Sequence, residues 1–130
     1  MNFSNFDDRC KDFIYQAQNE ALDNNHQQIL PEHLLKVYLN NYYSGNFILL
    51  NEIRFKKQII EDYLKTKYEN TPRVLGKNLK IYFSSPLVSI FNKVNDDLIT
   101  FNYKYISPEL LFYSLVSSKY TEIIDVIQRS

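Results

Sequence analysis

Few residues of this 130-residue chain are of the types that carry catalysis or bind metals. The histidines, His26 and His33, lie seven positions apart on different expected elements, and neither is joined by a cysteine or carboxylate at a spacing typical of zinc ligands. We interpret His33 as a packing or capping residue. With only Gly45 and Gly76 as glycines, the chain cannot form a GxxxxGK[ST] phosphate loop, so we expect no ATP hydrolysis by these residues.

Cys10 and two glutamates are the remaining candidates for chemistry. Cys10 falls on the apolar stripe of an expected helix, where burial raises the thiol pKa and disfavours a nucleophile, and a single cysteine fits a reducing compartment. Glu32 and Glu109 each follow a proline and could form a carboxylate pair. A glutamate in the first helical turn is favoured by the helix dipole, which explains Glu32 more simply, whereas a binding role for Glu109 stays open. We expect no catalytic residue, no cofactor and no metal.

The elements that position these residues occur twice. The string Ile-Leu-Pro-Glu-His-Leu-Leu at residues 29–35 returns as Ile-Ser-Pro-Glu-Leu-Leu-Phe at residues 106–112, 77 positions later, as Pro31 and Pro108 show. The same offset pairs Phe6 with Phe83. An internal duplication of a small helical unit is typical of scaffolds that hold partners.

Apolar residues recur at helical spacing through most of the chain. They predict helices over residues 6–22, from Pro31, around 47–50, over 54–68, from Ser85, from Pro108 and over 120–127. Ser4 or Asn5 is expected to cap the first helix, and Ser107 the helix that starts at Pro108.

The predicted fold class is all-α, with two pseudo-symmetric repeats of a four-helix unit in a single domain over residues 1–130. Repeat one covers about residues 1–68, a connection about 69–82, and repeat two about 83–130. The counterpart of the helix over 54–68 would begin one position past Ser130, so repeat two is expected to lack its last helix. That absence predicts an exposed apolar edge near Ile123 and Ile127.

Charge and hydropathy exclude several classes of partner. The 15 basic and 15 acidic side chains cancel, which disfavours nucleic acid, anionic lipid and a helix-turn-helix DNA-binding function. No apolar run is long enough for a membrane span, and the first residues lack the pattern of a secretory signal. We expect a soluble, cytoplasmic protein.

The Pro-Glu-His-Leu-Leu string, its diverged second copy and the segment over 16–22 resemble the amino-terminal domain of the Clp chaperone ATPases. Within that family, the run Thr-Pro-Arg-Val-Leu-Gly at 71–76 is similar to the Pro-x-Val-x-Gly run of the ClpB disaggregase branch. The resemblance implies a module of two four-helix repeats, tethered to a hexameric ATPase ring, that captures unfolded or aggregated polypeptide and passes it to the ring.

The resemblance also implies a site: an apolar groove with a polar rim at Asp7, Tyr103, Glu109 and Leu110. Glu109 and Leu110 keep the family's residue types, whereas Asp7 stands where a threonine is usual and Tyr103 where an acid is usual, which predicts an altered rim or weaker binding. Leu110→Glu is expected to reduce client binding at unchanged helical content. Two alternatives stay open, namely docking of folded adaptor proteins, as in protease-linked relatives, and a free-standing scaffold or dimerisation protein.

Overall fold

The computed structural model describes residues 2–76 and 80–130, and this part of the chain is mostly helical. Its helices are α1 (Asp8–Asp23), α2 (Pro31–Tyr43), the 3-10 helix η1 (Leu49–Glu52), α3 (Lys57–Glu69), α4 (Ser85–Thr100), α5 (Pro108–Val116) and α6 (Glu122–Arg129). The all-α class is confirmed. Two short parallel strands, β1 (Gln28–Ile29) and β2 (Tyr82–Phe83), were not predicted because two residues are too few to show a period.

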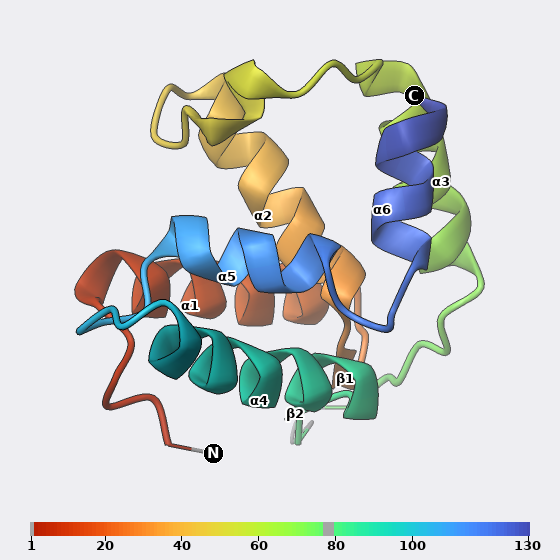
Figure 1. The fold of residues 1–130 in the computed structure, drawn as a ribbon. Coiled ribbons are helices and arrows are strands. Elements are labelled where there is room, and N and C mark those ends of the chain that lie inside the picture. Colours follow the sequence, from red (N-terminus) through yellow and green to blue (C-terminus); the bar gives the residue numbers. More distant parts are fainter. Residues whose placement is uncertain (1, 77–79) are drawn as a thin grey trace.

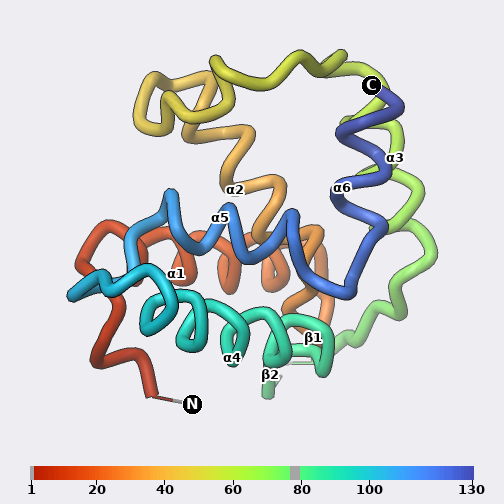
Figure 2. The backbone as a smooth tube through the Cα atoms, viewed as in Figure 1, coloured from red at the N-terminus to blue at the C-terminus, as the bar shows by residue number. Residues whose placement is uncertain are grey.

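Two groups of helices make up the molecule. Helices α1, α2, α4 and α5 pack together, while α3 and α6 lie side by side and contact the N-terminal part of α2 (Figure 1). The backbone trace shows α1 and α4 running through the lower half, with the C-terminus at the end of α6 (Figure 2).

Residues 77 positions apart also share their local backbone structure. Helices α1 and α4 are each 16 residues long and begin 77 positions apart. Their N-caps, Asp7 and Ser84, each accept a hydrogen bond from the backbone amide three residues on. Asn25 and Asn102, also 77 apart, both have φ of 57°. The expected cap at Ser4 or Asn5 is wrong, because Asp7 takes that position.

The strand contacts cross between the repeats. Ile29 of repeat one pairs with Phe83 of repeat two, and the isolated bridge from Phe6 to Ile106 repeats this pairing in the opposite direction. The matching hydrogen bonds run from the Asp7 amide to the Ile106 carbonyl at 2.9 Å and from the Ser84 amide to the Ile29 carbonyl at 3.0 Å. Each repeat therefore completes the other's strand pair.

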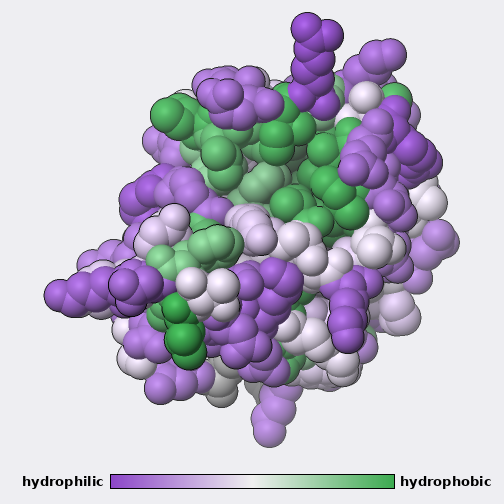
Figure 3. All heavy atoms as spheres, in the orientation of Figure 1, coloured by the Kyte–Doolittle hydropathy of each residue, from purple (hydrophilic) through white to green (hydrophobic). Residues whose placement is uncertain are grey.

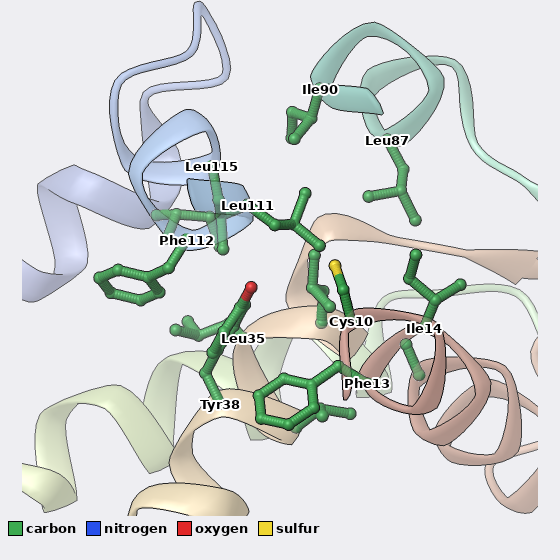
Figure 4. Packing of buried hydrophobic residues seen from close by; sticks show 14 of the residues in the cluster. Cys10, Phe13, Ile14, Leu35, Tyr38, Leu87, Ile90, Leu111, Phe112 and Leu115 are labelled. Carbon is green, nitrogen blue, oxygen red and sulfur yellow. The ribbon is translucent and has the colours of Figure 1, made fainter. Parts of the chain in front are cut away.

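The hydrophobic core fills the space between α1, α2, α4 and α5 (Figure 4) and continues to α3 and α6 through Leu64 and Ile123. Cys10 lies in this core, fully buried, and burial raises the pKa of its thiol. The buried Tyr38 hydroxyl donates to the Pro108 carbonyl at 2.7 Å, so the polar atom at the centre is paired. The side chains labelled in the close-up converge from all four helices: Cys10, Phe13, Ile14, Leu35, Tyr38, Leu87, Ile90, Leu111, Phe112 and Leu115.

The predicted apolar edge on the last helix is wrong. Ile123 and Ile127 are 0% and 5% exposed, because α6 packs against α2, α3 and α5. Apolar side chains gather instead in a hollow bordered by η1, α5 and α6 (Figure 3). At the offset of 77, η1 corresponds to the end of α6, and α5 corresponds to α2. Helix α3 contacts both α2 and α6. The hollow is thus where a counterpart of α3 would lie.

Candidate functional site

A cavity of about 540 Å³ on repeat two brings together three of the four expected site residues, Tyr103, Glu109 and Leu110. Its walls are the loop between α4 and α5 and the first two turns of α5. We call this cavity the aromatic groove; its other lining residues are Phe101, Lys104, Tyr105, Ser107 and Tyr113.

Asp7 does not line the aromatic groove. Its Oδ1 accepts the Cys10 amide hydrogen at 2.7 Å and so caps α1. A capping carboxylate at a helix N-terminus stabilises the fold, and one of its oxygens is already used. The structure therefore gives Asp7 a structural task beside any role in binding.

Four exposed aromatic side chains dominate the groove. Phe101, Tyr103, Tyr105 and Tyr113 have between 41% and 59% of their surface exposed. The Phe101 ring stacks on Tyr103 with centroids 5.8 Å apart and meets the Tyr113 ring edge-on at 5.3 Å. Exposed aromatic surface gathered in a concave site is typical of protein-binding surfaces.

Sequence reasoning named only one of these four aromatic residues. Phe101, Tyr103 and Tyr105 alternate along the loop, and this alternation was the available signal. Tyr113 lies on the outer side of α5, and its contribution to the groove follows only from the packing of that helix.

Glu109 forms an ion pair at the end of the groove. Its Oε1 lies 3.1 Å from Nη1 of Arg9, and Nη2 of Arg9 also donates to the Asn46 carbonyl at 3.2 Å. Both charged side chains are about half exposed. Exposed pairs of this kind contribute about 0 to 1 kcal/mol, so an incoming ligand can displace the contact at little cost.

Leu110 forms the floor of the groove, with 6% of its surface exposed. A glutamate at this position would place a carboxylate in a largely apolar setting. Leu110→Glu is therefore expected to lower stability as well as binding, and Tyr103, at 59% exposed, is the better position for a test.

The family model described as "Clp repeat (R) N-terminal domain" matches residues 5–129. The chain belongs to this family. The match covers nearly the whole sequence, so the aromatic groove lies on a Clp N domain.

Curated relatives of this Clp N domain are ClpB chaperone proteins. The sequence is 27% identical to ClpB of Mesorhizobium japonicum over 130 residues, which is 100% of this chain and 15% of that protein. It is 30% identical to ClpB of Rickettsia bellii over 97 residues, covering 74% of this chain and 11% of that protein. The chain thus spans about a seventh of the curated relatives' length.

Solved structures share the fold. The Hsp104 N-terminal domain from Candida albicans superimposes with a TM-score of 0.78 at 18% identity, covering 97% of this chain and 81% of that one. The N-terminal domain of the caseinolytic protease associated chaperone ClpD from Arabidopsis thaliana gives 0.71 at 19% identity, with 99% and 86% covered.

The histidines of this Clp N domain form a buried pair. Nδ1 of His33 accepts the Leu30 amide hydrogen at 2.8 Å, so neutral His33 carries its proton on Nε2 and donates it to Nδ1 of His26 at 2.8 Å. Burial lowers the pKa of His33 to about 3, with a further contribution from His26, and burial also lowers the pKa of His26. The prediction that His33 is a packing or capping residue is confirmed, since it is buried and accepts the Leu30 amide hydrogen; its contact with His26 was not predicted.

Glu32 is fully buried beside this pair and does more than begin a helix. Its carboxylate accepts hydrogen bonds from the hydroxyls of Tyr63 and Tyr120, both at 2.7 Å to Oε2. Burial, together with these bonds to Glu32, raises the pKa of both tyrosines. The cluster ties α2 to α3 and to the segment before α6.

Within residues 2–76 and 80–130, no group of three or more His, Cys, Asp or Glu side chains is placed to hold a metal ion. In the same part of the chain, no helix has the length and apolar character needed to cross a bilayer.

Proposed function

We propose that this Clp N domain binds unfolded or aggregated polypeptide in the aromatic groove and delivers it to the ATPase ring of a ClpB-type disaggregase. Tyr103, Glu109 and Leu110 are the proposed binding residues in the groove, and Asp7 is proposed to contribute from outside it; Phe101, Tyr105 and Tyr113 extend the surface. The supporting observation is the set of four exposed aromatic side chains around one 540 Å³ cavity.

The domain acts in this proposal as a non-catalytic module. Unfolded chains expose apolar side chains in no fixed order, and an aromatic surface recognises them without a fixed sequence. Six copies on a hexameric ring raise the local concentration of weak sites, so each groove needs only modest affinity.

The test measures binding of a reduced and alkylated, permanently unfolded protein by fluorescence anisotropy. Tyr103→Ala is expected to weaken binding, and the double variant Tyr103→Ala/Tyr105→Ala more so. Tyr15→Ala is the matched control, because Tyr15 is 60% exposed on α1 and does not line the groove. Equal binding by the double variant and the control would refute the proposal.

A second candidate is docking of a folded adaptor protein on a polar surface. A cavity of about 650 Å³ between α4 and the segment before α6 favours it, since Lys93, Asp96, Ser117 and Lys119 line this cavity. An adaptor that binds here would lose affinity in Lys119→Glu and keep it in Tyr103→Ala. The opposite pattern would refute this candidate.

A further inference from the structure

The aromatic groove has a counterpart in repeat one. By the offset of 77, Lys104, Tyr105 and Ser107 match Gln27, Gln28 and Leu30, which line a smaller cavity of about 270 Å³. The proposed binding residues Tyr103, Glu109 and Leu110 match His26, Glu32 and His33 in the same way.

The other wall of the smaller cavity is a segment of the chain itself. Lys67, Asn70, Thr71, Pro72 and Val74 line it, and we call residues 67–74 the covering segment. This segment comprises the end of α3 and the extended stretch that follows it.

Two contacts hold the covering segment in place. The Tyr68 ring lies against both histidine rings, with centroids 5.3 Å from His26 and 5.0 Å from His33. Six residues later, the Val74 amide donates to the Asn25 carbonyl at 2.9 Å, beside an antiparallel bridge between His26 and Arg73. The Tyr68 ring and the Val74 amide thus hold the covering segment against Asn25 and the two histidines.

The result is that one site is covered and its counterpart is open. His26, Glu32 and His33 are all 0% exposed. Among their counterparts, Tyr103 is 59% exposed and the Glu109 side chain 42% exposed, whereas Leu110, which forms the floor, is 6% exposed.

The backbone beneath both sites is the same. Asn25 and Asn102 share φ of 57°, and the amides that follow them donate to matching carbonyls, His26 to Ala21 at 2.9 Å and Tyr103 to Leu98 at 3.0 Å. The Asn102 carbonyl therefore has the same local backbone setting as the Asn25 carbonyl, which accepts the Val74 amide hydrogen.

We propose that the aromatic groove binds polypeptide segments that repeat the contacts of the covering segment. The client's aromatic side chain lies against Tyr103 and Leu110, and the amide six residues later donates to the Asn102 carbonyl. This inference rests on the proposed function and names the class of client: an aromatic residue in the last turn of a helix, followed by a turn and a short extended stretch, with the donating amide six residues after the aromatic residue, as in the spacing from Tyr68 to Val74.

The surroundings of the groove also indicate which aromatic residues of a client can bind there. The Tyr68 hydroxyl donates to Glu20 at 3.2 Å, but the counterpart of Glu20 is Asp97, whose Oδ2 already accepts from Lys93 at 2.6 Å and from Ser114 at 2.7 Å. A client hydroxyl is therefore not needed, and phenylalanine should bind about as well as tyrosine.

The test uses a labelled peptide with the sequence of residues 65–75, blocked at both ends, and the full chain. Binding is followed by anisotropy and by ¹H–¹⁵N chemical-shift changes. We expect shifts at Asn102, Tyr103 and Leu110. Replacing the peptide tyrosine by phenylalanine should change the affinity less than about twofold, and replacing it by alanine should weaken binding on the order of tenfold.

Two matched controls test the register. N-methylation of the valine in the peptide removes the amide donor and should weaken binding, whereas N-methylation of the adjacent leucine should not. On the protein side, Tyr103→Ala should weaken binding of the peptide and Tyr15→Ala should not.

Several outcomes would overturn the inference: no binding, equal binding of a scrambled peptide, or shifts at Asn25 and His26, which would mean that the peptide displaces the covering segment. If unfolded protein loses affinity in Tyr103→Ala but the scrambled peptide binds equally, the inference fails and the proposed function stands. If the peptide binds the groove as described but unfolded protein does not bind, the proposed function fails and the mode of recognition stands.

Discussion

Acidification should destabilise this domain through His33. The folded-state pKa of His33 is about 3, against 6.5 for an ordinary histidine, because the ring is buried. Between these values the unfolded chain binds a proton that the folded chain does not, so the stabilisation is complete above pH 6.5 and decreases as the pH falls. At pH 5, which is 1.5 units below 6.5, the loss is about 2 kcal/mol at 1.36 kcal/mol per unit.

The assay is urea unfolding followed by far-UV circular dichroism at pH 7 and pH 5. The comparison variant is His33→Gln, because glutamine at this position can still accept the Leu30 amide hydrogen but does not titrate. The wild type should lose about 2 kcal/mol more than the variant between the two pH values, and titrating groups that do not contact His33 cancel in this difference. A difference below about 0.5 kcal/mol, the error of the extrapolation, would refute the assignment of this loss to His33.

Three further outcomes follow from the packing. Asp7→Ala should cost about 1 kcal/mol of unfolding free energy by thermal denaturation, whereas Asp7→Ser should be nearly neutral because Ser84 caps α4 in the same way; equal losses would contradict the capping role. Tyr120→Phe removes a hydrogen bond to the buried Glu32 and should cost about 1.5 to 3 kcal/mol, which chemical denaturation would measure. Cys10 should resist a thiol reagent in the native protein and react in urea, and fast native labelling would show that the first helix opens.

Local signals predicted the helices well. Proline at the first helical position marked the starts of α2 and α5, and Ser107 caps α5 as expected, its Oγ accepting the Leu110 amide at 3.1 Å. These features depend on neighbouring residues, which a sequence displays directly. The division into repeats near residues 68 and 83 stays a prediction.

Contacts between residues far apart in the chain could not be predicted from the sequence. The His26–His33 contact requires the left-handed Asn25 that turns the chain after α1, and the Glu32 cluster requires tyrosines 31 and 88 positions away. The exposed fraction of each site residue could not be predicted either, since Leu110 directly follows the exposed Glu109 yet forms the floor of the groove. Tertiary packing decides such features.

The crossed strand pairs have a consequence for how such a molecule can arise. A chain carrying one repeat alone would leave Ile29 without Phe83, and Phe6 without Ile106, so both partners would have to come from another molecule. Two identical chains related by a twofold axis could supply each other's missing partner. In such a homodimer the backbone bonds that now join the two halves of one chain would join two separate molecules.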